Sequence, residues 1–331
     1  MVHQFWLLLF PSYTFKTAMD TIIQSAKNKL INGEDGRSVV EFLRTTFVKD
    51  QEEGRERKLS SLHNLMTDVR SSFKGETLPP SIETFKLTRE EVIQLKQGHE
   101  LAQLHKNEHL LVIPDATALL TKAEELLLSA TPSHSNPRLL LPLLLVSGRR
   151  LSEMTSPRVS YTPVADNPYY CTVVGILKKR QQAFTGRIPL LVPWATFKVG
   201  LDAWRQKQRA ETTDKRRLRA KKALDELTNK ELKVRYDLPM TVAIQRNYVF
   251  TLPMYMRYNK NKELTLQHCK VHDLRAVYAA FVFALYECDE SFNRTAMRAC
   301  LHDTLSESLS YSHVRLDGTE VLHDCLGPLL K

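Results

Sequence analysis

Side chains suited to act on a phosphate group recur along the last two thirds of the chain. Two arginines follow an apolar run and a Ser-Gly turn, two lysines lie in a basic stretch between apolar segments, and a His-x-x-Arg pair opens an apolar helix. A further histidine stands nine residues before a tyrosine. The set comprises Arg149, Arg150, Lys178, Lys179, His272, Arg275, His302 and Tyr311. Each feature is common by itself, so only their combination indicates a site.

Together these side chains could carry out a displacement at a phosphodiester. Arginine forks match the geometry of phosphate oxygens and stay charged, and imidazole donors stabilise the charge that develops there. A lysine with a lowered pKa can protonate a leaving alkoxide, while a tyrosine can form a phosphotyrosine and so split one displacement into two reversible steps. We expect no cofactor, because the sequence shows no P-loop, dinucleotide fingerprint or acidic metal cluster.

The overall composition favours a polyanionic partner inside the cell. There are 47 Lys+Arg against 37 Asp+Glu, a net charge of +10, which makes nucleic acid a better first expectation than membrane. The 5 cysteines are odd in number and lack CxxC spacing, which indicates reduced thiols. The apolar run 5–10 is too short to span a bilayer and lacks a cleavage site. We expect an intracellular protein, cytoplasmic in a bacterium or phage-infected cell, or nuclear or viral if it comes from a eukaryotic virus.

The elements that must position these residues divide into two units. Over residues 1–109, three stretches have apolar residues at helical spacing, "FKTAMDTIIQSAKNKLI", "GRSVVEFLRTTFV" and "LSSLHNLMTDVRSSF". The run "KDQEEGRERK" between two of them is typical of a solvated surface. After the break "KGETLPPSIE", Thr88 and Glu91 have the spacing of a capping box. This pattern predicts a helical N-terminal unit.

Residues 110–331 are expected to form the second unit, mainly helical with a small β-hairpin. Asp115 is placed to cap the helix "ATALLTKAEELLLSA", and a second apolar helix leads to the two arginines. The segments "YYCTVVGI" and "GRIPLLVPW" are rich in strand-forming residues, with the basic loop "LKKRQQAFT" between them. Alternation in a hairpin would point either Lys178 or Lys179 inwards, and we favour Lys178.

Further basic residues could contact DNA along its backbone. Arg180 continues the basic loop, and a strongly basic helix is predicted over 214–235, either as a face that follows phosphates or as an ordinary solvated surface. The expected DNA contacts outside the catalytic set are Arg149, Lys179, Arg180, Arg216, Arg217 and Lys221.

In their order along the chain, these boxes resemble the signature of the tyrosine recombinases. "SGRRLSE" resembles the first arginine box, which implies that Arg150 clamps the phosphate. Glu153 would then hold the Arg150 side chain or cap the next turn. "HDLR" resembles the His-x-x-Arg box, and "LHDTLSESLSYSHV" the box that ends in the nucleophilic tyrosine. The resemblance implies a 3′-phosphotyrosyl intermediate and the catalytic set Arg150, Lys178, His272, Arg275, His302 and Tyr311. His313 is expected to support the site or to be solvated.

Within this superfamily the chain resembles the protelomerases, or telomere resolvases, over about residues 110–316. The likeness is carried by "VSGRR" with its following acid, "KKR" after a strand that contains glycine, "LRAVYA" and "LVIPDATALL". Two positions depart from the pattern: His272 stands where this branch often has lysine, and Leu301 where recombinases usually have glycine.

The resemblance implies cleavage of a palindromic replicated telomere and resealing of each strand to its complement as a closed hairpin. The implied partners are double-stranded DNA with an inverted repeat and a second copy of the chain, and no membrane. The N-terminal unit would clamp the far side of the duplex. A conventional site-specific recombinase or integrase, or a catalytically lapsed DNA-binding protein of the same fold, are the alternatives.

Overall fold

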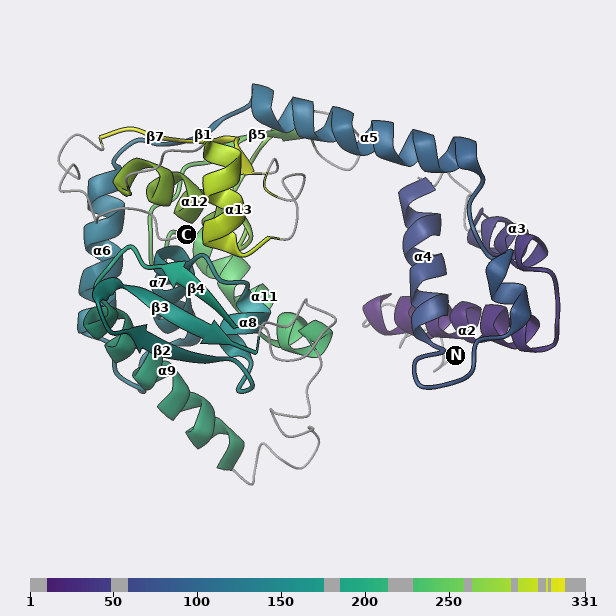
Figure 1. Ribbon diagram of the computed structural model, residues 1–331, viewed down its shortest axis with the longest axis horizontal. Coiled ribbons are helices and arrows are strands. Elements are labelled where there is room, and N and C mark those ends of the chain that lie inside the picture. Colours follow the sequence, from purple (N-terminus) through teal and green to yellow (C-terminus); the bar gives the residue numbers. More distant parts are fainter. Residues whose placement is uncertain are drawn as a thin grey trace, which may run out of the picture. The chain divides into compact units, whose positions relative to one another are not determined.

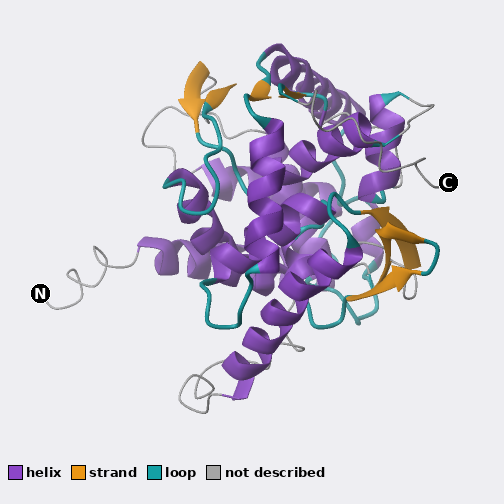
Figure 2. Ribbon diagram, turned by 90° about the vertical axis from the view of Figure 1, so that its left-hand side faces the viewer, coloured by secondary structure: helices purple, strands orange, loops and turns teal. Residues whose placement is uncertain are grey.

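The protein divides into two compact units, Met1–Ala102 and Gln103–Lys331. Figure 1 shows the computed structural model, which describes residues 11–48, 59–175, 185–213, 229–258, 264–286, 291–302, 308 and 311–318. The division falls within helix α5 (Arg89–Glu108), slightly before the boundary predicted between residues 109 and 110. Helices far outweigh strands (Figure 2), which confirms the mainly helical prediction with small sheets.

The N-terminal unit contains the helices that its sequence predicts. These are α2 (Pro11–Ile31), α3 (Gly36–Val48) and α4 (Leu59–Ser71), followed by a short 3-10 helix, η1 (Pro80–Glu83), and the start of α5. The predicted capping box is confirmed, since the Glu91 N–H donates to Thr88 Oγ1 at 3.2 Å and the Thr88 N–H to Glu91 Oε2 at 2.9 Å. The helices pack on an apolar core formed by Leu30, Val39, Leu43, Leu65, Met66, Val69 and Phe85, among others.

The second unit is built around two buried helices. Every residue of 139–147 in helix α7 and of 273–282 in helix α12 is buried, so these two helices form the centre of the core and cannot slide without repacking it. The predicted cap at Asp115 is confirmed, because its Oδ1 accepts the Ala118 N–H at 2.8 Å. The helices of this unit are α6 (Ala116–Leu128), α7 (Asn136–Ser147), α8 (Leu151–Thr155), α9 (Trp194–Thr213), α11 (Asn229–Gln245), α12 (Asp273–Leu285) and α13 (Phe292–Cys300). In the described ranges, no helix combines the length and apolarity needed to cross a bilayer.

Among the described residues of the second unit, three small sheets are present. The two predicted strands are confirmed as β3 (Asn167–Val174) and β4 (Thr185–Pro189), which pair antiparallel, and an unpredicted strand β2 (Ser160–Val164) adds to β3. Strand β5 (Tyr255–Tyr258) pairs antiparallel with β6 (Leu264–Gln267). Strands β1 (Leu111–Ile113) and β7 (Val314–Leu316) pair in parallel, so the chain just after Tyr311 is fixed to the start of the unit.

Several predicted features lie outside the described residues. They are the apolar run 5–10, the charge run 49–58, most of the predicted basic helix 214–235, and the basic loop residues 176–184. The site residues affected are Lys178, Lys179, Arg180, Arg216, Arg217 and Lys221.

Candidate active site

The turn after helix α7 requires glycine. Gly148 has a φ of +60°, in the left-handed region that glycine adopts without strain. A Cβ at this position would also overlap the ring of Tyr278, whose hydroxyl donates to Pro189 O at 2.7 Å. The turn therefore ends a buried helix tightly enough to place Arg149 and Arg150 at the edge of the core.

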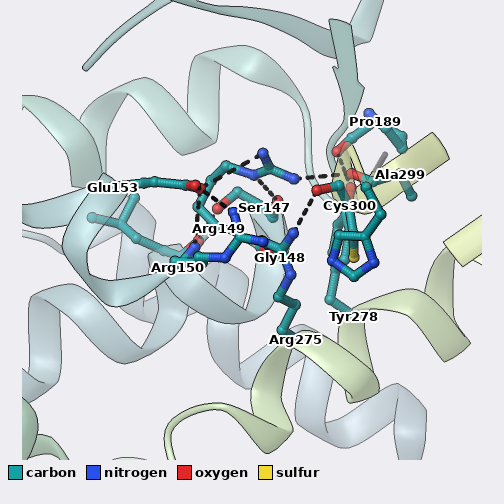
Figure 3. Close-up of polar contacts among 12 residues, drawn as sticks. Ser147, Gly148, Arg149, Arg150, Glu153, Pro189, Arg275, Tyr278, Ala299 and Cys300 are labelled. Atoms are coloured by element: carbon teal, nitrogen blue, oxygen red, sulfur yellow. Dashed lines mark hydrogen bonds and ion pairs between the residues drawn. The ribbon is translucent and has the colours of Figure 1, made fainter. Parts of the chain in front are cut away.

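Arg275 joins the ends of two helices to the predicted nucleophile. Its NH1 donates to Gly148 O at 2.6 Å, at the end of α7, and its NH2 donates to Cys300 O, at the end of α13 (Figure 3). Its Nε donates to Tyr311 Oη at 2.9 Å. The side chain is 2% exposed, and a guanidinium is well placed there because the carbonyl ends of helices carry partial negative charge.

Arg149 bridges the same two helix ends. Its Nε donates to Ser147 O at 3.3 Å and its NH2 to Ala299 O at 3.0 Å, and its guanidinium lies 3.7 Å from Glu153 Oε2 (Figure 3). The side chain is 0% exposed. These contacts give the buried Arg149 guanidinium an internal role in holding α7 against α13, and its predicted contact with DNA stays a prediction.

Glu153 organises the arginines around it. Its Oε1 accepts from Arg150 NH1 at 2.8 Å, and its Oε2 accepts the Arg150 backbone N–H at 3.3 Å. The carboxylate thus both holds Arg150 and caps helix α8, as predicted. Burial opposes its ionisation, but the guanidinium groups of Arg149, Arg275 and Arg150 outweigh burial and keep the pKa of Glu153 below its usual value.

Loss of the Glu153 charge is expected to destabilise the second unit. Glu153→Gln should lower the free energy of unfolding by about 3 kcal/mol, because it leaves buried guanidinium groups without their counter-ion. Glu125→Gln, at an exposed pair with Lys122, is the matched control and should change stability little. Urea unfolding at pH 7, followed by tryptophan fluorescence, measures both, and equal stabilities for Glu153→Gln and wild type would contradict the assignment.

The difference in unfolding free energy between wild type and Glu153→Gln should depend on pH in a defined direction. A carboxyl whose folded pKa is depressed stabilises fully above its unfolded value, 4.5 for Glu153, and loses that contribution as the pH falls through the lower folded pKa. The stability difference between wild type and Glu153→Gln should therefore be constant above pH 4.5 and shrink on further acidification.

The C-terminal turn of helix α13 presents His302. The His302 N–H donates to Met297 O at 2.8 Å and the Leu301 N–H to Arg298 O at 2.9 Å, the two bonds of a Schellman motif. Leu301 takes the left-handed position, with a φ of +55°, where the recombinase pattern has glycine. The turn is therefore formed by leucine, with its side chain partly buried against the core.

Tyr311 lies among three of the predicted residues. His302 Nε2 is 3.2 Å from Tyr311 Oη, on the same oxygen that receives the Arg275 bond, and the His272 ring is centred 6.0 Å from the tyrosine ring. Burial raises the pKa of Tyr311 to about 12, although Arg275 works against this shift. The phenol is thus protonated at neutral pH and must give up its proton as it attacks.

A basic cavity of about 690 Å³ opens beside these groups. Its wall includes Arg150, His272 and Arg275, with Lys270 contributed by the loop between β6 and α12. Among the described residues that line it, Asp237 alone carries a carboxylate. Cationic groups in such excess suit a phosphodiester, which needs charge neutralisation along its backbone.

The structure brings together five of the six predicted catalytic residues, Arg150, His272, Arg275, His302 and Tyr311, and the sixth, Lys178, lies outside the described residues. Sequence reasoning did not foresee the internal role of Arg149 or the polar network around Asp273, described below. The buried His313, which is 0% exposed, belongs to that network and is not solvated.

Comparisons with known proteins identify a family for most of the second unit. The family model described as the telomere resolvase ResT/TelK catalytic domain matches residues 111–313, which include all six predicted catalytic positions. A sequence comparison with curated proteins finds no match.

Solved protelomerases have a similar fold. Protelomerase TelA covalently complexed with substrate DNA has a TM-score of 0.66 and 16% identity, covering 89% of this chain and 88% of that one. A TelA mutant complexed with DNA hairpin product has a TM-score of 0.64 and 15% identity, with the same coverage of both chains. Protelomerase TelK complexed with substrate DNA has a TM-score of 0.53 and 12% identity, and the match covers 96% of this chain and 62% of that one.

The solved structures confirm a tyrosine recombinase-like fold, and the family match extends over more than half of the sequence and contains every predicted catalytic residue. This chain therefore belongs to the family defined by the ResT/TelK telomere resolvase catalytic domain.

Proposed function

We propose that this protein cleaves and rejoins DNA at replicated telomeres and converts them into covalently closed hairpin ends. The observation that carries the proposal is the position of Tyr311 Oη, bonded to Arg275 Nε at 2.9 Å and lying 3.2 Å from His302 Nε2. A phenol held between a fixed cation and an imidazole is arranged for nucleophilic attack on a phosphate.

In the proposed cleavage step, each catalytic side chain that the structure describes has a defined role. The scissile phosphate enters the basic cavity, where Arg150 and Arg275 pair with its non-bridging oxygens and His272 donates a further hydrogen bond. Tyr311 Oη attacks phosphorus while its proton passes to His302 Nε2. The bond from phosphorus to the 5′ oxygen breaks, which leaves a 3′-phosphotyrosyl link.

Resealing reverses these steps with a different 5′ hydroxyl. If that hydroxyl belongs to the complementary strand, the product is a hairpin. A palindromic target presents two equivalent half-sites, so we propose that a homodimer acts on the DNA. We further propose that the N-terminal unit contacts the duplex on the side away from the active site and that the protein works inside the cell.

The test is hairpin formation on a defined substrate. Linear DNA carrying the inverted repeat from the ends of the protein's own replicon is incubated with the protein, and the products are run on a denaturing gel. Closed products that snap back after heating are expected, and DNA with one half-site scrambled should give none. Exchange between two duplexes without hairpins would instead identify a conventional recombinase, and untouched DNA would contradict the enzymatic proposal.

We propose Lys178 as the general acid that protonates the leaving 5′ oxygen. Lys178→Ala should slow cleavage by about 10²-fold or more, whereas Lys179→Ala should have a small effect. A 5′-bridging phosphorothiolate supplies a leaving thiolate that needs no proton, so it should restore the rate of Lys178→Ala. Quenched-flow cleavage assays on both substrates measure this, and rescue of Lys179→Ala alone would move the role to Lys179.

A further inference from the structure

A buried carboxylate lies one residue after His272, at the start of helix α12. Asp273 is 3% exposed, and its Oδ2 accepts three hydrogen bonds. Tyr255 Oη and Arg257 NH1, both from strand β5, donate at 3.0 Å each, and the Lys270 backbone N–H donates at 2.8 Å. The bond from the Lys270 N–H is sufficient to cap the start of helix α12. The bonds from Tyr255 and Arg257 therefore add a link between strand β5 and the helix.

The other oxygen of Asp273 faces the chain that carries the nucleophile. His313, two residues after Tyr311, has its Nε2 at 4.0 Å from Asp273 Oδ1, an ion-pair distance when the imidazole is protonated. The His313 ring also stacks on Tyr255, with centroids 6.0 Å apart and an interplanar angle of 26°. On its backbone side, His313 O accepts the Leu111 N–H at 2.7 Å, next to the β1–β7 pairing. The segment after Tyr311 is therefore held from two sides.

We infer that Asp273 is a positioning residue, which holds the nucleophile segment and the end of helix α12 in one fixed arrangement. The inference rests on the proposed function. His272 and Arg275 flank Asp273 on α12, while Tyr311 precedes His313, so the carboxylate connects both halves of the reacting set. In-line attack demands such precision, since a misplacement of 1 Å can slow a reaction by about 10²-fold.

The cost of this arrangement also favours a functional role. A buried carboxylate is destabilising unless its oxygens are satisfied, and an apolar residue of similar size often serves stability equally well. Three donors and an imidazole converge on Asp273 from a strand, a loop and the chain after Tyr311. Fixing these elements relative to one another is what the arrangement achieves.

The inference is tested by separating DNA binding from the chemical step. Asp273→Asn should reduce single-turnover cleavage of a suicide substrate by about 10²-fold. The dissociation constant for the same DNA should stay within about twofold, because affinity comes from phosphate contacts elsewhere. Cleavage at the wild-type rate, or a binding loss as large as the cleavage loss, would overturn the inference.

A gentler variant guards against misfolding. Tyr255→Phe removes one hydroxyl from the Asp273 network and should slow cleavage on the order of tenfold. Tyr286→Phe is the matched control, since its buried hydroxyl donates to Tyr169 O at 3.1 Å and Leu190 O at 2.6 Å, away from the site. The control should cleave at the wild-type rate. Equal rates for the two variants would overturn the role of the network even if Asp273→Asn does not fold.

A modified substrate distinguishes positioning from acid catalysis. The 5′-bridging phosphorothiolate bypasses the general acid but still needs an aligned nucleophile, so Asp273→Asn should stay slow on it. Recovery to the wild-type rate would show that Asp273 acts through the leaving group and would reject the inference. Absence of any adduct with wild-type protein would reject the proposed function itself, whereas equal cleavage by wild type and Asp273→Asn would reject the inference alone.

Discussion

Tyr311→Phe is expected to abolish the covalent DNA adduct while DNA affinity stays within about twofold of wild type. The exchange removes only the oxygen that receives the Arg275 bond and lies beside His302, and no other part of the ring can attack phosphorus. Suicide DNA substrates trap the adduct, which denaturing gels detect, and a gel-shift titration measures affinity.

An exposed tyrosine provides the control for this experiment. Tyr248 is 64% exposed, so Tyr248→Phe should form the adduct at the wild-type rate. An adduct formed by Tyr311→Phe would show that another residue is the nucleophile, and the assignment of the site would fail.

Arg275→Lys should slow cleavage on the order of 10³-fold, although the charge is kept. A lysine ammonium is a point charge and cannot reproduce a planar fork that reaches Gly148 O, Cys300 O and Tyr311 Oη together. The variant therefore loses both the hold on the nucleophile and one clamp on the phosphate. Single-turnover cleavage at saturating DNA isolates this effect from binding.

The control for Arg275→Lys is the same substitution at an exposed site, Arg315→Lys, where the arginine pairs with Asp317. It should leave the cleavage rate close to wild type, because exposed pairs contribute little. A rate for Arg275→Lys within tenfold of wild type would contradict the role assigned to its guanidinium fork.

The sequence predicted most helices and most of the reacting set because both depend on local patterns. Apolar spacing and caps at Thr88 and Asp115 mark where helices begin. The resemblance of "SGRRLSE" to the first arginine box selects Arg150 over Arg149, and in the structure Glu153 accepts a hydrogen bond from the Arg150 guanidinium.

The remaining features depend on contacts between distant parts of the chain. Three-residue strands such as β1 and β7 carry too little pattern to be recognised, and only the fold pairs them. Arg149 reads as a solvated cation in a basic sequence, yet the approach of the α13 end buries it. The network around Asp273 joins residues from β5, α12 and the chain end, and no spacing along the sequence indicates that they meet.

Leucine at position 301 makes the placement of His302 a cooperative property of the core. A left-handed leucine costs about 1 kcal/mol or more, which glycine would avoid. The turn persists because the Leu301 side chain packs against the core, so its geometry depends on that packing being intact. A glycine turn would not need this packing to keep its shape. Here the position of the imidazole beside Tyr311 depends on the packing of the core around Leu301.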